Sequence, residues 1–212
     1  MAELKYIAVE GLIKSGKSRL AGILAQEFKA RLIADNQENP FLQEYYESLA
    51  SPANPLALKT QLIFLLNRYH QQLELNQKDL FQKTTVTDYI FFKDGIYAHA
   101  LLNDEDLDIY KKILAIFSER ITPCDLVIYL QTSFAEMLQR IHKNGSEQEK
   151  KVPSEYWREI FEAYNYYFFN YKMSPLLVVN VEKTDFNNKQ DITNLVREIR
   201  TPKKGVTYYA PA

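Results

Sequence analysis

Residues Val9–Arg19 read VEGLIKSGKSR and contain the pattern G-x-x-x-x-G-K-S, which runs from Gly11 to Ser18. A short apolar segment, Tyr6–Val9, precedes the pattern, and Ser18–Phe28 follows it with apolar residues at helical spacing. This order predicts a strand, a loop and a helix. In such a loop, glycines let backbone N–H groups point inward at phosphate oxygens, and the start of the helix adds positive potential. The stretch therefore predicts a phosphate-binding loop.

The side chains of this loop have distinct expected contacts. Lys17 is expected to reach the β- and γ-phosphate oxygens, and the Ser18 hydroxyl is expected to bind Mg²⁺. The whole loop is expected to surround the phosphates of a nucleotide: Gly11, Leu12, Ile13, Lys14, Ser15, Gly16, Lys17 and Ser18. Lys14 is unusual because the variable positions of such loops are commonly small or neutral. A second lysine here either points to solvent or adds a charge for the phosphates.

The rest of the chain alternates short apolar segments with amphipathic ones. Strands are predicted at 6–9, 31–34, 84–88, 124–131 and 176–181, and helices at 18–28, 41–49, 55–81, 91–102, 105–121, 134–143, 154–171 and 191–200. Strands this short and apolar indicate an α/β fold of three layers, with a five-stranded parallel sheet and helices on both faces. Residues 1–200 are predicted to form one domain, with a mobile charged loop at about 143–153 and a tail at 201–212.

Composition narrows the classes of partner. The chain has 212 residues, of which 46% are hydrophobic, and its formal net charge is −1. This balance favours a small-molecule partner over nucleic acid or an anionic membrane. The sequence contains a single cysteine, Cys124, and neither a secretory signal nor an apolar run long enough to cross a membrane. We therefore expect a cytoplasmic protein.

Asp88 is predicted at the carboxyl end of a strand, together with Gly11 and Gln131. In open parallel sheets, ligands bind beyond the carboxyl ends of the strands. Asp88 is thus a candidate for holding Mg²⁺ through water or for contacting the reacting phosphate. The alternative is an ordinary aspartate that caps the start of a helix.

Several further stretches resemble the deoxynucleoside kinase family, especially bacterial deoxyadenosine/deoxyguanosine kinases. The similar blocks, in the order of the family, are IAVEGLIKSGKS at the start, ENPFLQEYY (38–46), TQLIFLLNRYHQQ (60–72), TDYIFFKDGIYA (87–98), DLVIYLQTS (125–133), LLVVNV (176–181) and GVTYYAP near the end. The resemblance implies a P-loop nucleoside kinase-like fold, ATP and Mg²⁺ as cofactors, a deoxynucleoside as acceptor with a purine base favoured, and a homodimer.

The resemblance also assigns residues to the acceptor. Gln61 matches the glutamine that hydrogen-bonds the base, and Arg68 matches the arginine that pairs with an aspartate near the base, here Asp94. Glu149 matches the loop glutamate on the sugar 3′-hydroxyl, and Tyr45 of the ENPFLQEYY block is expected to line the same site. Taken alone, Gln61 is an ordinary helix residue and Arg68–Asp94 an ordinary ion pair.

The sequence departs from the family around the reacting groups. The acidic residue that takes the proton from the 5′-hydroxyl aligns with Ala34. Asp35 is the candidate substitute, although a shift by one position predicts that its side chain turns to the other side of an extended segment. Arginines that the resemblance predicts elsewhere are replaced by Tyr89, Gly95, Asn144 and Ser146. Arg140 is retained in the segment that the resemblance identifies as a lid, RIHKNGSEQE (140–149).

These losses suggest a purpose for Lys14. One class of thymidylate kinases supplies the cation from its phosphate loop, at the position that Lys14 occupies here. We therefore hypothesise that Lys14 and Arg140 act on the phosphates, with Lys14 replacing the lid arginines in part, because lysine lacks the two-pronged contact of arginine.

Three functions remain open from the sequence. The first is a deoxynucleoside kinase that uses Lys17, Asp88 and Asp35 at the reacting centre. The second is a catalytically impaired homologue that binds a nucleotide or nucleoside, since the five departures gather at that centre. The third is a thymidylate kinase-like enzyme with a monophosphate acceptor, for which the cue is Lys14.

Overall fold

A computed structural model describes residues 4–35, 38–50, 54–75, 83–209 and 211 of the chain. The strands are β1 (Tyr6–Gly11), β2 (Arg31–Ile33), β3 (Thr85–Thr87), β4 (Leu126–Gln131), β5 (Leu176–Asn180) and β6 (Val206–Tyr209). The helices are α1 (Lys17–Phe28), α2 (Leu42–Glu47), η1 (Ser48–Ala50), α3 (Ala57–Leu75), α4 (Lys93–Leu101), α5 (Asp104–Ser118), α6 (Phe134–Asn144), α7 (Glu147–Lys151), α8 (Ser154–Phe169) and α9 (Lys189–Ile199).

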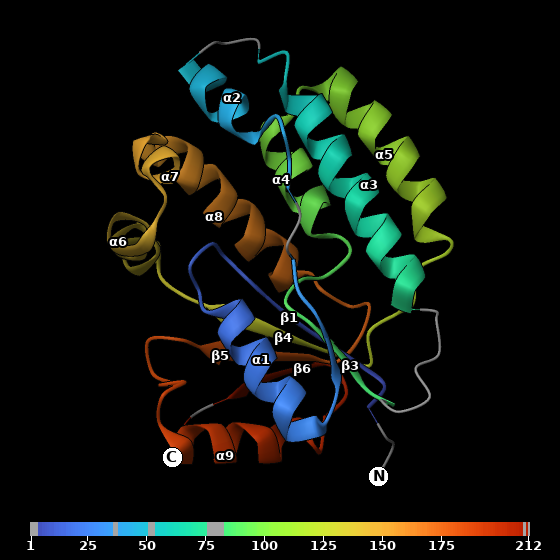
Figure 1. The fold of residues 1–212 in the computed structure, drawn as a ribbon, viewed down its shortest axis with the longest axis vertical. Coiled ribbons are helices and arrows are strands. Elements are labelled where there is room, and N and C mark those ends of the chain that lie inside the picture. The colour runs from blue at the N-terminus through green and yellow to red at the C-terminus, as the bar shows by residue number, and fades with distance from the viewer. Residues whose placement is uncertain (1–3, 36–37, 51–53, 76–82, 210, 212) are drawn as a thin grey trace.

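All six strands pair in parallel in the order β2-β3-β1-β4-β5-β6. Successive residues of a strand face opposite sides of a sheet. Thus Ile7 and Val9 pack with α1 and α9, whereas Tyr6 and Ala8 pack on the side of α4, α6 and α8. Figure 1 shows this division, with α1 and α9 on one side of the sheet and α3, α4, α5 and α8 on the other. The predicted three-layer α/β fold is confirmed.

The predicted number of five strands is wrong, because the segment expected to be a tail contributes β6. Val206–Tyr209 pairs in parallel with β5 and occupies the edge of the sheet. Its side chains are exposed or half-buried, so the strand lacks the fully apolar pattern by which the buried strands were predicted. Its β-branched and aromatic composition was the available signal.

The charged segment 143–153 also differs from the expected loop, because it contains the short helix α7. Ser146 caps this helix: its hydroxyl accepts a hydrogen bond from the Glu149 backbone N–H, and the Glu149 carboxylate accepts one from the Ser146 N–H. Ser-x-x-Glu is the sequence signature of such a capping box. This capping box fixes the orientation of the Glu149 side chain in the first turn of α7.

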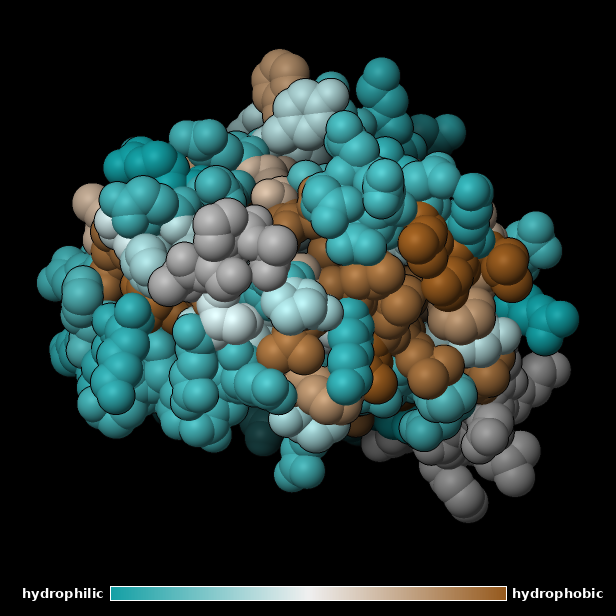
Figure 2. All heavy atoms as spheres, turned by 90° about the horizontal axis from the view of Figure 1, so that it is seen from above, coloured by the Kyte–Doolittle hydropathy of each residue, from teal (hydrophilic) through white to brown (hydrophobic). Residues whose placement is uncertain are grey.

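The long predicted helix at 55–81 is α3, which ends at Leu75; residues 76–82 lie outside the described part of the chain. Its inner face carries buried polar residues, and its outer face packs on α5 through apolar side chains. Leu66 and Leu73 of α3 and Ile109 and Ile116 of α5 are 40–64% exposed. Figure 2 looks down on this end of the molecule and shows apolar side chains gathered where α3 and α5 lie.

Within the ranges that the structure describes, no helix is both long enough and apolar enough to cross a membrane.

Candidate active site

The loop between β1 and α1 has the backbone geometry that the glycine pattern predicts. Gly16 lies at φ 98° and Lys14 at φ 59°, both in the left-handed region. A Cβ at Gly11 would lie 2.8 Å from the Leu130 carbonyl oxygen of the neighbouring strand, so only glycine fits there. Leu12 and Ser15 are buried beneath the loop. The turn is thereby fixed between two strands and the start of α1, with successive N–H groups available to an anion.

Lys17 begins α1, and its side chain folds back over this loop. Its Nζ donates hydrogen bonds to the carbonyl oxygens of Gly11 at 2.8 Å and Leu12 at 3.0 Å. Burial and the nearby charge of Lys93 lower the pKa of Lys17 to about 8. A phosphate group at this point would supply the negative charge that favours the protonated form.

Ser18 and Asp88, the two residues expected to hold Mg²⁺, lie in contact. The Ser18 hydroxyl donates a hydrogen bond to Asp88 Oδ2, and Asp88 Oδ1 accepts one from the Asp35 backbone N–H at 2.6 Å. Asp88 is buried immediately beyond β3. Its carboxylate does not cap α4, which begins at Lys93 with Phe92 at the cap position. The alternative that Asp88 is a helix cap is therefore wrong.

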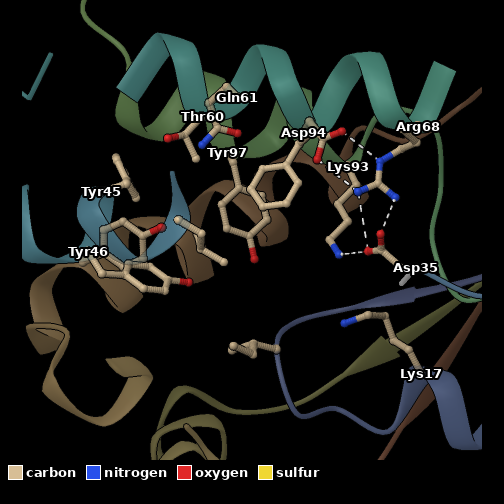
Figure 3. A pocket seen from close by; sticks show the side chains of 14 residues that line it. Lys17, Asp35, Tyr45, Tyr46, Thr60, Gln61, Arg68, Lys93, Asp94 and Tyr97 are labelled. Atoms are coloured by element: carbon tan, nitrogen blue, oxygen red, sulfur yellow. Dashed lines mark hydrogen bonds and ion pairs between the residues drawn. The ribbon is translucent and has the colours of Figure 1, made fainter. Parts of the chain in front are cut away.

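A cavity opens between this loop and α3 (Figure 3). It is lined by Ile13, Lys17, Asp35, Leu42, Tyr45, Tyr46, Thr60, Gln61, Phe64, Arg68, Lys93, Asp94, Tyr97 and Tyr156. Pockets for small molecules commonly combine apolar walls with a few polar groups. Residues from six separate segments of the sequence thus line one cavity that reaches the phosphate-binding loop.

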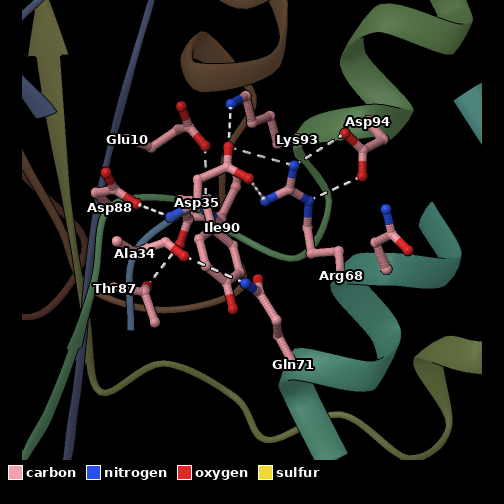
Figure 4. Close-up of polar contacts among 12 residues, drawn as sticks. Glu10, Ala34, Asp35, Arg68, Gln71, Thr87, Asp88, Ile90, Lys93 and Asp94 are labelled. Atoms are coloured by element: carbon pink, nitrogen blue, oxygen red, sulfur yellow. Dashed lines mark hydrogen bonds and ion pairs between the residues drawn. The ribbon is translucent and has the colours of Figure 1, made fainter. Parts of the chain in front are cut away.

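The end of the cavity near the loop is a cluster of buried charges (Figure 4). The Arg68 guanidinium donates to Asp94 through Nε at 2.8 Å and Nη2 at 3.2 Å, and to Asp35 through Nη1 at 3.2 Å. Lys93 Nζ lies 2.6 Å from Asp35 Oδ2. Although burial opposes the charge on Arg68, Asp94 and Asp35 raise its pKa. The predicted Arg68–Asp94 pair is present and has a third member, Asp35.

Asp35 faces this cavity, so the expectation that it turns to the opposite side is wrong. The alternation of an extended strand ends at Ile33, where β2 stops. The Ala34 carbonyl oxygen then accepts a hydrogen bond from Gln71, and the Asp35 N–H is held by Asp88. Burial alone would raise the pKa of Asp35, but Lys93 and Arg68 outweigh it and hold that pKa well below its usual range. The carboxylate is therefore ionised at neutral pH.

The other end of the cavity is aromatic and uncharged. Tyr156 contacts Tyr45 and Tyr46 edge-on, and the rings of Tyr45 and Tyr46 are tilted against each other. Burial is the main cause that raises the pKa of Tyr45 to about 12. Gln61 projects from α3 into this end, and the buried hydroxyl of neighbouring Thr60 has no hydrogen-bond partner among the described residues. The arrangement offers an amide and a hydroxyl at the edge of an apolar slot, which suits a planar heterocycle.

The lid contacts the outer side of the phosphate-binding loop. Lys14 Nζ lies 2.9 Å from Glu149 Oε2, with the two side chains 29% and 16% exposed. Arg140 pairs with Glu136 at 2.6 Å, and its Nη1 donates to the carbonyl oxygens of Lys14 and Ser15 at 3.4 and 3.5 Å. Neither Lys14 nor Glu149 lines the cavity. Lys14 is thus held by the lid and does not extend freely into solvent.

Two charged residues of the site were not recognised in the sequence. Glu10 is fully buried behind the loop, where its carboxylate accepts hydrogen bonds from the Gly11 and Ile90 N–H groups, and burial raises its pKa. Lys93 lies in the TDYIFFKDGIYA block, directly before Asp94. The absence of the expected arginines at Tyr89 and Gly95 was the signal that another cation was needed there.

Comparisons with known proteins agree with this geometry. The chain is 28% identical over 203 residues to a deoxyguanosine kinase of Bacillus subtilis, covering 92% of this chain and 96% of that protein. It is 29% identical over 206 residues to a deoxyadenosine/deoxycytidine kinase of the same organism, covering 91% and 90%. A structure of deoxyadenosine kinase from M. mycoides with bound dATP superposes with a TM-score of 0.77 at 22% identity, covering 92% of this chain and all of that one. A sequence model described as deoxynucleoside kinase matches residues 7–202, and the chain therefore belongs to the deoxynucleoside kinase family.

Proposed function

We propose that this protein is an ATP-dependent deoxynucleoside kinase, which transfers the γ-phosphoryl group of ATP to the 5′-hydroxyl of a deoxynucleoside. One observation carries the proposal. A single cavity joins the phosphate-binding loop, through Lys17 and Asp35, to the face of α3 that bears Gln61 and Arg68. Donor and acceptor sites in one enclosed volume allow in-line transfer by positioning and charge stabilisation.

The donor side consists of the loop and Lys17. The backbone N–H groups of Gly11–Ser18 surround the phosphates of ATP, and Lys17 contacts their outer oxygens. Mg²⁺ fits the pair of Ser18 and Asp88, because both offer oxygen ligands and lie in contact. Mg²⁺ commonly keeps waters and substrate phosphates as its other ligands, so two protein groups suffice. When bound, the ion offsets charge on the phosphates.

The acceptor side holds the nucleoside with its base between the tyrosines and its sugar toward Asp35. Gln61 presents a donor and an acceptor to the base edge, and the Thr60 hydroxyl adds a third polar atom. We favour a purine deoxynucleoside because the relatives include kinases named for deoxyguanosine and deoxyadenosine.

Asp35 is the proposed acceptor of the 5′-hydroxyl proton. Its lowered pKa makes it a weak base before transfer. Phosphoryl transfer passes through a loose transition state in most analyses, so proton removal contributes less than positioning does. Asp35 therefore acts mainly by accepting the hydroxyl hydrogen bond and aiming the oxygen at the phosphorus. Glu149 contacts the sugar 3′-hydroxyl in this proposal, which requires it to leave its ion pair with Lys14.

The proposal extends to assembly and location. A groove between α4 and α8 is lined by Ile96, Tyr166, Tyr167 and Met173, and Tyr166 is 76% exposed. Aromatic side chains and methionine are enriched in protein interfaces. We propose a homodimer formed across this face, as the family resemblance implies. We also propose a cytoplasmic location, where ATP is available and the half-buried thiol of Cys124 stays reduced.

The first prediction concerns activity. Purified protein with ATP and Mg²⁺ is expected to phosphorylate deoxyadenosine or deoxyguanosine, measured by a coupled ADP assay and by product mass. Gln61→Ala removes the base contact and should lower kcat/KM about 10- to 100-fold, since a lost hydrogen bond in a buried pocket costs about 1–3 kcal/mol. Gln43→Ala, at an exposed position of α2 that does not line the cavity, is the matched control. Transfer to deoxynucleoside monophosphates alone, or nucleotide binding without transfer to any acceptor, would contradict the proposal.

The second prediction concerns Lys14. Lys14→Ala removes a charge beside the phosphates and should lower the turnover number at least about tenfold, equivalent to about 1.5 kcal/mol. Lys143→Ala removes an exposed lysine of the same lid and should leave turnover unchanged. A turnover number for Lys14→Ala within about threefold of wild type would show that this lysine only fastens the lid to the loop.

The third prediction concerns pH. Lys17 has a pKa of about 8 in the nucleotide-free protein, and phosphate contact raises it. Above pH 8 the neutral amine must take up a proton to bind ATP, so Kd should rise about tenfold between pH 7 and pH 9. Titration calorimetry at pH 8.5 in two buffers of different ionisation enthalpy should detect this proton uptake. A Kd that is constant over this range would refute the coupling.

The fourth prediction concerns assembly. Light scattering should give about twice the 24.8 kDa mass of one chain. Tyr166→Glu places a charge in the α4–α8 face and should yield monomers, because burying an unpaired charge is costly. Ile116→Glu changes an exposed apolar residue on α5, 64% accessible, and should remain dimeric. A monomeric wild-type protein would overturn the proposed homodimer.

A further inference from the structure

Lys93 occupies a position from which it can reach the transferred group. It is the first residue of α4, and its side chain extends into the cavity that Lys17 also lines. Nζ lies 2.6 Å from Asp35 Oδ2, and both side chains are 17% exposed. Figure 4 shows Lys93 and Arg68 approaching the Asp35 carboxylate from different sides. Lys93 is therefore one of the charges that surround the proposed 5′-hydroxyl position.

The other cations of the cavity have most of their donors committed. Arg68 uses four of its five N–H donors on carboxylates: Asp94 accepts from Nε and Nη2, and Asp35 accepts from Nη1 at 3.2 Å and Nη2 at 3.5 Å. Its guanidinium lies 4.6 Å from the Tyr89 ring centre. Lys17 belongs to the phosphate-binding loop, where its Nζ donates hydrogen bonds to the carbonyl oxygens of Gly11 and Leu12. The ammonium group of Lys93 has three N–H donors, and its one hydrogen bond within the described ranges is to Asp35. Two donors thus remain for a ligand.

The four positions where the family resemblance predicts arginine, 89, 95, 144 and 146, carry no positive charge in this chain. Position 89 holds a buried tyrosine. A side chain added at Gly95 would meet Leu114 of α5 at 3.6 Å, on the side of the helix away from the cavity. In the lid, Asn144 ends α6 and Ser146 caps α7. Among the described residues, Lys93 is the cation that lines the cavity, lies next to Asp35 and keeps two unused donors.

We propose that Lys93 is a catalytic residue that bridges Asp35 and the γ-phosphoryl group of the donor, and so replaces the arginine missing at Tyr89. This inference rests on the proposed kinase function. During transfer the bond from the γ-phosphorus to the β–γ bridging oxygen breaks, and a bond to the acceptor 5′-oxygen forms. The hydroxyl proton passes to Asp35 and then to solvent, while ADP leaves with the electrons of the broken bond. Lys93 offsets charge on the moving phosphoryl oxygens throughout.

The proximity of Lys93 to Lys17 is consistent with this role. Burial lowers the pKa of Lys17 most, and Lys93 lowers it further, so two like charges face the same point. Such a pair is unfavourable unless carboxylates or phosphates lie between them. Asp35 provides part of that compensation, and a triphosphate would provide the rest.

The test measures single-turnover phosphoryl transfer in Lys93→Met and Lys93→Arg. Arginines that contact the transferred group contribute about 10³–10⁵ in rate, and lysine makes a less specific contact. Lys93→Met should therefore slow transfer about 10²- to 10³-fold with the deoxynucleoside KM changed less than threefold, whereas Lys93→Arg should stay within about tenfold of wild type. Lys112→Met is the matched control, because Lys112 also pairs with an aspartate, Asp108 at 2.7 Å, but is 72% exposed on α5.

A double-mutant cycle separates a direct contact from an effect through Asp35. If Lys93 contacts the phosphoryl group, Asp35→Asn/Lys93→Met should transfer at least about 30-fold more slowly than Asp35→Asn. Equal rates for these two variants would show that Lys93 acts only by neutralising Asp35 and would overturn the proposal. Both proteins lack the buried charge on Asp35, so the comparison holds even where Lys93→Met alone folds poorly.

A binding measurement keeps this inference distinct from the kinase proposal. Wild-type protein should bind the β,γ-imido analogue of ATP more tightly than ADP, and Lys93→Met should reduce that ratio of Kd values at least about fivefold, whereas Lys112→Met should keep it. A wild-type protein without turnover would refute the kinase function, and this ratio would still decide the role of Lys93. An unchanged ratio together with unchanged transfer would overturn the inference.

Discussion

The partly buried carboxylate of Asp35 connects the two halves of the site. It is held by Arg68 from α3, by Lys93 from α4 and, through its own backbone N–H, by Asp88 beyond β3. Removing one partner of such a buried cluster leaves an uncompensated charge, which commonly costs about 3–5 kcal/mol. The position of α3 relative to the sheet, and therefore the shape of the cavity, depends on this cluster. The sheet and its helices place these residues near one another, and the ion pairs of Asp35 then connect α3 and α4 to the end of β2 beside the phosphate-binding loop.

Much of this arrangement followed from periodicity and from the glycine pattern. The loop was predicted from its glycine pattern, and the buried strands were predicted because parallel strands are continuously apolar. The helix α3 was predicted because residues 55–81 have a broad apolar face and a proline near their start. The edge strand β6 was not predicted because its side chains are exposed or half-buried. The helix α7 was not predicted because five residues are too few to show a periodic apolar face, although the Ser-x-x-Glu capping signature was present in the sequence.

The site was harder to predict because orientation depends on where a strand ends. Extrapolating the alternation of β2 by two residues turned Asp35 the wrong way, since the strand stops at Ile33 and the chain bends toward Asp88. Lys93 was overlooked because the helix predicted at 91–102 does not by itself reveal that this side chain points into the cavity. Contacts with residues that are distant in the sequence, rather than the local sequence pattern, determine where the Asp35 and Lys93 side chains point.

The balance of charges around the phosphate-binding loop has a consequence for nucleotide affinity. Arg68 is matched by Asp94, Lys93 by Asp35, and Lys17 faces Glu10, Asp35 and Asp88 at longer range. The attraction for a triphosphate thus comes from fixed backbone dipoles and from short-range contacts with Lys17 and Lys93, rather than from the formal net charge of the chain, which is −1. Because such short-range, buried interactions are weakly screened by dissolved ions, binding should persist at ionic strengths that abolish purely electrostatic association.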